Sequence, residues 1–327
     1  MKCMVTGSTG FIGNRLVNEL LHRGEEVHVL ARSKEKVVEL FGSKVTFFGG
    51  DLWDTDVVEE ATHNCDIIFH LAAFANIWSK DKMLAYKTNV TGTKNILEAA
   101  HRNKIKKVVF TSSAAVFPAS QNGEEIDETF LLPRNFLTEY ETTKVQAEQL
   151  CADYCKNGLD VVIVNPPRVF GPGILNKSNS VTILIKKYIN GKWRIIPGNG
   201  EAVGNYVFID DVVNGHILAA QKGLSGEKYI IGGTNISFNG FFKTLANVSG
   251  KNYMLFHFPF SLMLAISKFE LFSAETFGKN PLITPPWARR YLQNRPLSSK
   301  KAIAHLNYAV TPLEEGMRKT IDWLKWN

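Results

Sequence analysis

The feature that most constrains the fold is an alternation of short apolar runs with helical patterns over the first half of the chain. The runs predict strands at residues 2–6, 27–31, 45–49, 67–71, 107–112 and 161–165. Apolar residues recurring every three or four positions predict helices at residues 10–23, 55–62, 81–103 and 138–157. Strands and helices that alternate at this spacing indicate βαβ units with right-handed crossovers. The sequence therefore predicts an α/β fold with a doubly wound parallel sheet, the Rossmann fold.

The pattern changes after Pro166, where Pro and Gly become frequent and the regular alternation ends. Further helices are predicted near 180–190, from about 210, and at 312–326. We expect residues 1–165 to form a dinucleotide-binding domain, with segments at about 204–232 returning to it. Residues 166–327 should mainly form a smaller C-terminal substrate lobe. The apolar stretch 253–272 contains two charges and a proline, so we expect a buried or surface-docked amphipathic helix and no integral membrane segment.

Composition narrows the function classes. The chain has 38 Lys and Arg against 31 Asp and Glu, a net charge of +7, but these residues are scattered. Without a long basic run we expect no nucleic-acid partner, whereas an anionic small ligand suits the charge. The four cysteines resemble neither a disulfide framework nor a metal site, so we expect reduced thiols and no metal. The first strand begins at Lys2, which leaves no room for a signal peptide, and we expect a cytoplasmic protein.

A glycine-rich loop follows the first strand. Gly7, Gly10 and Gly13 lie between that strand and an apolar-periodic helix. In this context the first glycine allows the turn, the second allows backbone to approach a pyrophosphate, and the third allows close helix packing. The helix N-terminus adds unpaired N–H groups and partial positive charge. We therefore predict dinucleotide contacts at Gly7, Thr9, Gly10, Phe11, Ile12 and Gly13.

The end of the second strand bears on which dinucleotide binds. An NAD site usually has Asp or Glu there, to accept from the ribose 2′-hydroxyl. This chain has Ala31-Arg32-Ser33 instead. A guanidinium suits a 2′-phosphate, so Arg32 predicts NADP, with NAD as the alternative cofactor. The alternative interpretation of Arg32 is a solvated basic loop.

A candidate proton-transfer group lies further along. Tyr140 and Lys144 are four residues apart on one predicted helix face. A cation close to a phenol favours its ionised form, so we expect Lys144 to lower the pKa of Tyr140 and also to bind the nicotinamide ribose. Tyr140 would donate a proton to a carbonyl oxygen in reduction and accept it in oxidation. Ser113, after the fifth strand, is the expected holder of the substrate oxygen, with Ser112 as the alternative.

Together these motifs resemble the extended short-chain dehydrogenase/reductase family over the whole chain. The markers that carry the resemblance are the glycine loop, Asp51-Leu52, His70-Leu71-Ala72-Ala73, Asn89-Val90-Thr91-Gly92-Thr93, Ser112-Ser113, Tyr140/Lys144, the 166–173 segment and the 206–212 segment. The Ala31-Arg32 pair and the apolar C-terminal lobe look most like dihydroflavonol reductases and 3β-hydroxysteroid dehydrogenases. Ala114 and Ala115 stand where sugar-nucleotide dehydratases carry an acidic pair, which argues against that chemistry. Asn165 stands where the family often has Arg.

The resemblance implies further site residues. Asp51 and Leu52 would contact the adenine, Ala72 and Ala73 would line the cofactor groove, and Asn89 would support the active site. Pro166 would begin the segment over the nicotinamide. The analogy also suggests a homodimer. Independently of it, Asp210 or Asp211 is expected to cap a helix.

Three functions remain open from the sequence. The favoured one is an NADP(H)-dependent oxidoreductase that reduces a ketone or aldehyde of a largely apolar small molecule, or oxidises the matching secondary alcohol. Its expected substrate contacts are Phe74, Trp78, Ser113, Phe117 and Arg168, with Ile77 and Trp287 nearby. The second is a nucleotide-sugar epimerase with tightly bound NAD, in which Arg168, Arg289 and Arg290 would bind a diphosphate. The third is a non-catalytic dinucleotide-sensing protein.

Overall fold

A computed structural model describes residues 1–131 and 135–326. A seven-stranded parallel sheet with the order β10-β6-β5-β4-β1-β2-β3 organises most of the chain. Its strands are β1 (Lys2–Thr6), β2 (Glu26–Ala31), β3 (Thr46–Gly49), β4 (Ile67–His70), β5 (Lys107–Thr111), β6 (Val161–Val164) and β10 (Lys228–Tyr229). Strand order reverses between β1 and β4, where Thr6 pairs with His70. In a doubly wound sheet this reversal opens the crevice in which ligands bind.

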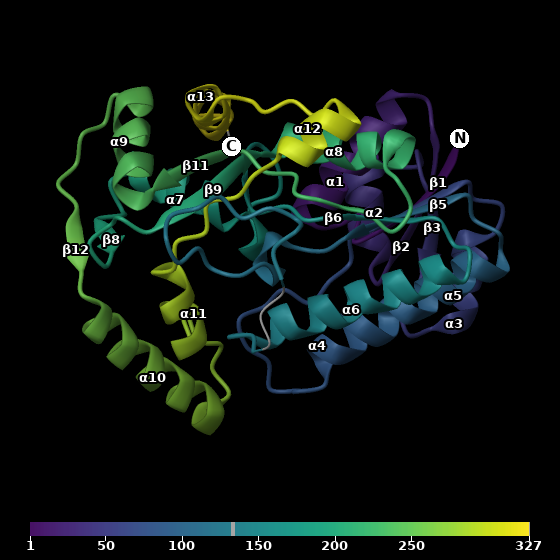
Figure 1. The fold of residues 1–327 in the computed structure, drawn as a ribbon, viewed down its shortest axis with the longest axis horizontal. Coiled ribbons are helices and arrows are strands. Elements are labelled where there is room, and N and C mark those ends of the chain that lie inside the picture. The colour runs from purple at the N-terminus through teal and green to yellow at the C-terminus, as the bar shows by residue number, and fades with distance from the viewer. Residues whose placement is uncertain (132–134, 327) are drawn as a thin grey trace.

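Helices cover both faces of this sheet, and successive strand residues serve the two faces in turn. In β1, Cys3 and Val5 pack in the cluster beneath α1 (Phe11–His22), α2 (Lys34–Phe41) and α8 (Ile209–Lys222). Met4 packs in the opposite cluster, beneath α3 (Thr55–Thr62), α5 (Gly92–Arg102) and α6 (Glu139–Lys156). Figure 1 shows α1 and α8 on one side of the sheet and α3, α5 and α6 on the other. Strands buried on both faces explain the near-continuous apolar runs, and the predicted Rossmann fold is confirmed.

The helical stretch expected at 81–103 is present from Leu84 to Arg102, with a π-helical turn that the sequence did not predict. The structure has a short α4 (Leu84–Tyr86), a π-helical turn η1 (Lys87–Thr91) and then α5. Single π-helical turns inside α-helices frequently occur at functional sites. Here the turn contains Asn89, whose side-chain contacts are described below.

The second half builds a smaller lobe around two small sheets. One joins β7 (Arg168–Phe170), β9 (Val203–Phe208) and β11 (Thr234–Ser237), and the other pairs β8 (Ile195–Pro197) with β12 (Phe256–Phe258). The accompanying helices are α7 (Ser180–Ile189), α9 (Phe238–Ser249), α10 (Phe260–Phe277), α11 (Pro285–Tyr291) and α13 (Leu313–Leu324), and short 3₁₀ turns form η2 (Ala114–Val116) and η3 (Lys177–Asn179). Between these segments α8 and β10 return to the large sheet, and α12 (Lys300–Leu306) packs on α8.

One expectation about the second half was wrong. Neither Asp210 nor Asp211 caps a helix, because α8 begins at Ile209 and both aspartates lie in its first turn. Asp211 instead accepts hydrogen bonds from the backbone N–H (2.7 Å) and hydroxyl (2.6 Å) of Thr311. The apolar stretch 253–272 is divided by Pro259 into β12 and α10, and the outer face of α10 is exposed. Among the described residues no helix is long and apolar enough to cross a membrane.

Candidate functional site

The loop between β1 and α1 is a tight turn packed against the loop after β4. Gly7 has a φ of +69°, and a Cβ there would lie 2.7 Å from the backbone nitrogen of Ala72. A Cβ on Gly13 would lie 2.2 Å from the Gly7 carbonyl oxygen, so α1 approaches the loop this closely only with glycine there. Gly10 is the N-cap of α1 without a side-chain capping bond, and no acidic residue lies in the first turn. The free N–H groups and partial positive charge of this end, where Thr9, Phe11 and Ile12 also lie, suit a phosphate.

Polar atoms of this loop and of the neighbouring strand ends are compatible with a bound dinucleotide. Thr6 Oγ1 accepts the N–H groups of Leu71 and Ala72, both at 3.1 Å, which ties the two loops together. Ser8 Oγ and Ser112 Oγ are buried and have no hydrogen-bond partner among the described residues. A buried hydroxyl without a partner is costly, so these two groups suit a site that a polar ligand completes.

The predicted nucleotide-selecting residues lie at the ends of β2 and β3. Arg32 is exposed, and within the described part of the chain its guanidinium makes no hydrogen bond or ion pair. Ser33 caps α2 by accepting from the Lys36 N–H at 3.2 Å. Asp51 accepts from the Leu52 N–H at 2.8 Å, and Leu52 is buried beneath α5. Arg32 is thus free to meet a ligand, whereas Asp51 and Leu52 already have turn and packing roles.

Ser113, Tyr140 and Lys144 come together at the carboxyl edge of the sheet. The Ser113 hydroxyl hydrogen-bonds the Tyr140 phenol and accepts the Ala115 N–H at 3.1 Å. Lys144 is buried one turn after Tyr140 on α6, and its Nζ donates to the Thr111 carbonyl at 2.7 Å. The end of β5 and one face of α6 therefore hold the hydroxyl, the phenol and the ammonium in fixed positions.

The electrostatics of this group differ from the expectation. Burial raises the pKa of Tyr140, and only the Ser113 hydrogen bond and the Arg290 charge oppose that effect. Lys144 is not among the groups that shift the pKa of the phenol here, and its ammonium is directed to the Thr111 carbonyl. Burial lowers the pKa of Lys144 to about 8. Tyr140 is consequently a protonated phenol at neutral pH, which is the form that donates a proton.

Asn89 forms hydrogen bonds both to α6 and to the loop that follows β4. Its Oδ1 accepts the Phe74 N–H at 2.7 Å, and its Nδ2 donates to the Phe74 carbonyl at 3.1 Å. The same amide donates to Thr143 Oγ1, 2.9 Å away on α6. The π-helical turn orients Asn89 so that one side chain fixes both the substrate-side loop and the helix of Tyr140 and Lys144.

A narrow cavity adjoins Tyr140. The side chains around it are mainly aromatic or apolar, namely Phe74, Asn76, Ile77, Trp78, Ala85, Thr138, Glu139, Tyr140 and Trp287. Trp78 Nε1 is buried without a hydrogen-bond partner in the described residues. The cavity thus offers an indole N–H donor and a phenol donor in aromatic surroundings.

Two other predicted substrate residues are engaged elsewhere. Phe117 is buried in a cluster with Val116, Ile126 and Leu297. Arg168 donates to the Tyr206 hydroxyl at 2.7 Å and lies over the rings of Tyr206 and Phe238. Neither lines the cavity beside Tyr140. Pro166 is buried, and its carbonyl accepts the Ala114 N–H at 3.0 Å, next to Ser113.

Comparison with known proteins agrees with this geometry. The model of the NAD dependent epimerase/dehydratase family matches residues 3–232. The chain belongs to that family. It is an NAD(P)-dependent oxidoreductase of the extended short-chain dehydrogenase/reductase type.

Individual relatives share most of its length. The chain is 29% identical to a Synechocystis protein named "Putative dihydroflavonol 4-reductase", over 98% of this chain and 94% of the other. It is 32% identical to sterol demethylase protein B of Methylococcus capsulatus, over 82% and 80%. Among solved structures, the Thermus thermophilus UDP-glucose 4-epimerase complex with NAD superposes with a TM-score of 0.80 at 26% identity, over 99% of both chains.

Asn165, the departure from the family pattern, belongs to a buried polar group behind this epimerase/dehydratase site. Its Nδ2 donates to Glu148 Oε1 at 2.8 Å and to the Ser113 carbonyl at 3.2 Å. Lys228 pairs with the other Glu148 oxygen at 2.5 Å. A lysine from β10 thus supplies the positive charge beside Glu148, and Asn165 links that carboxylate to Ser113.

A second buried ion pair joins the two lobes and was missed by the sequence analysis. Glu141, next to Tyr140 and only 2% exposed, pairs with Arg290 of α11. Arg295 approaches the same carboxylate at 3.8 Å. Glu141 Oε2 also accepts the Thr138 N–H at 3.0 Å and completes a capping box. The Thr138-x-x-Glu141 spacing signals the cap, but the pairing with Arg290 depends on how the distant lobe docks.

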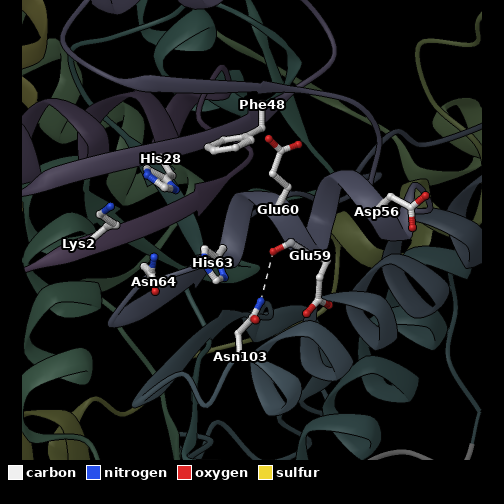
Figure 2. A pocket seen from close by; sticks show the side chains of 9 residues that line it. All are labelled: Lys2, His28, Phe48, Asp56, Glu59, Glu60, His63, Asn64 and Asn103. Atoms are coloured by element: carbon white, nitrogen blue, oxygen red, sulfur yellow. Dashed lines mark hydrogen bonds between the residues drawn. The ribbon is translucent and has the colours of Figure 1, made fainter.

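A larger hollow lies away from this site, at the opposite end of the sheet. Figure 2 shows its nine lining residues, which include His28, Phe48, Glu59, His63 and Asn103. Two of these residues have ordinary partners: Glu59 pairs with Arg102, and His28 Nδ1 lies 2.9 Å from the Ala61 carbonyl. We therefore place the functional site beside Tyr140. Among the described residues no group of three or more His, Cys, Asp or Glu could hold a metal ion.

Proposed function

We propose that this enzyme uses NADPH to reduce a ketone or aldehyde group of a largely apolar small molecule, or oxidises the matching secondary alcohol. The observation that carries the proposal is the hydrogen-bonded Ser113–Tyr140 pair beside an aromatic cavity, next to the crevice of the dinucleotide-binding fold.

The chemistry divides between cofactor and protein. The bound nicotinamide supplies the hydride. Tyr140 donates its proton to the carbonyl oxygen, and Ser113 hydrogen-bonds that oxygen beside the phenol. The raised pKa of Tyr140 keeps the phenol protonated at neutral pH, which suits reduction. Lys144 and Tyr140 would hold the nicotinamide ribose, with Asn89 fixing their helix.

Recognition of the cofactor would rest on the glycine loop and Arg32. The exposed guanidinium of Arg32 at the end of β2 is suited to a 2′-phosphate, and no carboxylate competes at that point of the strand. The groove that holds the cofactor between Arg32 and the nicotinamide site would be completed by Asp51, Leu52, Ala72, Ala73 and Pro166.

Recognition of the substrate would rest on Phe74, Trp78 and Trp287. These aromatic side chains favour an apolar skeleton, and Trp78 Nε1 is available to a polar group on it. Relatives named for dihydroflavonol reduction and sterol dehydrogenation support such a substrate. The epimerase alternative loses support because Arg168 and Arg290, offered for a diphosphate, are bonded to Tyr206 and Glu141.

Equilibrium titrations with NADPH and NADH would test the cofactor assignment. Wild type should prefer NADPH, and Arg32→Ala should remove about 10- to 100-fold of that preference, the equivalent of one or two charge-assisted hydrogen bonds. Lys44→Ala, an exposed cation elsewhere, should leave it unchanged. A screen of apolar ketones and aldehydes with NADPH then tests the reaction. Tightly held NAD that does not exchange, or a preference unaffected by Arg32→Ala, would refute the proposal.

A further inference from the structure

Helix α10 packs on the protein through its small side chains and exposes its large apolar ones to solvent. The face packed on the protein carries Met263, Ser267 and Ala274. The outward face carries Leu262, Ile266, Phe269 and Phe272, and the two phenylalanines are 70% and 61% exposed. A helix stabilised by packing alone buries its largest apolar side chains, and here they face outward. That pattern marks an interaction surface.

The apolar surface continues beyond the helix. Met254 and Phe256 precede α10, Phe277 is its last residue and Leu282 follows it, and all four side chains are largely exposed. Figure 1 shows β12 and α10 along one outer edge of the lobe, with α11 between α10 and the rest of the molecule. We call Met254, Phe256, Leu262, Ile266, Phe269, Phe272, Phe277 and Leu282 the apolar edge.

The net charge of the chain is concentrated in the same lobe. Residues 180–204 and 238–295 contain eleven Lys and Arg and three Asp and Glu, and two of these cations, Arg290 and Arg295, face Glu141 of α6. Lys251, Lys268 and Lys279 are exposed within or beside the apolar edge, where the acidic residues are Glu275, which is exposed, and Glu270, whose carboxylate accepts the Leu282 N–H. Exposed phenylalanines flanked by lysines are complementary to an anionic lipid surface, where acyl chains receive the rings and headgroups pair with the ammonium groups.

The apolar edge is continuous with the wall of the catalytic cavity. Helix α10 packs against α11, and α11 carries Trp287, which lines the cavity beside Tyr140. α11 also carries Arg290, the partner of Glu141. An object bound on the apolar edge therefore lies one helix away from the substrate cavity.

We propose that the apolar edge docks this enzyme on the surface of an anionic lipid bilayer, with α10 lying in the plane of the headgroups. Among the described residues no helix is long and apolar enough to span the bilayer, so α10 would lie on it. Docking would bring the cavity to a membrane-dissolved substrate. The delivery of a membrane-dissolved substrate to the cavity rests on the proposed function, whereas the docking of the apolar edge on a bilayer does not.

Vesicle sedimentation tests the docking without any substrate. The full chain is mixed with vesicles of phosphatidylcholine containing 30% phosphatidylglycerol, or of phosphatidylcholine alone. We expect binding to the anionic vesicles, and Phe269→Glu/Phe272→Glu should weaken it by about tenfold or more. The matched control is Val38→Glu/Leu224→Glu, which places the same charges on exposed apolar residues of the large domain and should bind as wild type. Replacing Lys251, Lys268 and Lys279 by Gln should remove the dependence on phosphatidylglycerol.

Two results would overturn the proposal. One is equal partitioning of wild type and Phe269→Glu/Phe272→Glu onto anionic vesicles. The other is a concentration-dependent dimer in sedimentation equilibrium that the same double substitution converts to monomer, which would make a second copy the occupant. Tyr140→Phe should bind vesicles as wild type, so failure of the proposed reaction and failure of docking are separately visible.

Discussion

Helices α6 and α10 have the same length, 18 residues, and both depart from the usual distribution of polar and apolar side chains. Helix α6 buries polar residues, including Glu141, Lys144 and Glu148. Helix α10 exposes apolar ones, including Phe269 and Phe272. Each departure costs stability: a buried charge loses hydration, and an exposed ring stays in water.

The difference between the two helices concerns what compensates that cost. On α6 the compensation is inside the chain, since Glu141 has Arg290 and Glu148 has Lys228 and Asn165. On α10 no described residue covers the outer rings, so the compensating surface must come from outside. Buried polar residues therefore indicate a chemical site, and exposed apolar residues indicate a docking surface.

The largest effect should come from the chemistry on α6. Tyr140→Phe removes the proton donor while keeping the ring, and we expect the turnover number to fall by about 100- to 10,000-fold. NADPH should still bind, because Lys144 and the glycine loop would retain their contacts with it, although the ribose loses the Tyr140 hydroxyl. Tyr154→Phe, on the same helix outside the site, is the control and should retain activity. Turnover within about fivefold of wild type would remove Tyr140 from the proposed role.

The next effect concerns the ion pair between the lobes. Glu141→Gln leaves Arg290 buried without a counter-charge, and we expect the free energy of unfolding to drop by about 3–5 kcal/mol. Urea denaturation measures it. Glu139→Gln, an exposed neighbour, should change it by less than about 0.5 kcal/mol. Equal effects of the two substitutions would show that Glu141 is not compensated from within the chain.

A smaller effect should appear in the pH dependence of stability. Burial lowers the pKa of Lys144 from 10.5 to about 8, so between these values the unfolded chain binds a proton that the folded chain does not. The free energy of unfolding must then rise with pH across that window. Relative to Lys144→Met, wild type should gain about 2 kcal/mol between about pH 7.5 and pH 9.5 in urea denaturation. A difference that stays constant with pH would contradict the lowered pKa.

The smallest effect should come from α10. Phe269→Ser and Phe272→Ser should each change the free energy of unfolding by less than about 0.5 kcal/mol, because both rings are already in water. Phe11→Ala, at the buried first position of α1, should cost about 3–5 kcal/mol in the same urea measurement. A large loss of unfolding free energy in Phe269→Ser would mean that this ring stabilises the fold, which would contradict a role in docking alone.

Local patterns predicted much of the fold. The β1 and α1 elements, the glycine loop and the positions of Ser113, Tyr140 and Lys144 follow from short-range periodicity and motif spacing. The π-helical turn at Lys87–Thr91 did not, because its driving contacts are Asn89 with Phe74 and Thr143, distant in sequence. The pKa of Tyr140 was predicted in the wrong direction for a similar reason. Spacing shows that Lys144 is near, but not that its ammonium is bonded to Thr111.

The sequence by itself determined the parallel sheet, the glycine-rich loop after β1 and the Tyr140–Lys144 helix, because hydrophobic periodicity and glycine positions act over a few residues. The tertiary structure alone decided that Glu141 pairs with Arg290, that Glu148 pairs with Lys228, and that Phe269 and Phe272 of α10 are exposed. These features depend on where segments far apart in sequence pack, and burial and charge pairing are properties of that packing.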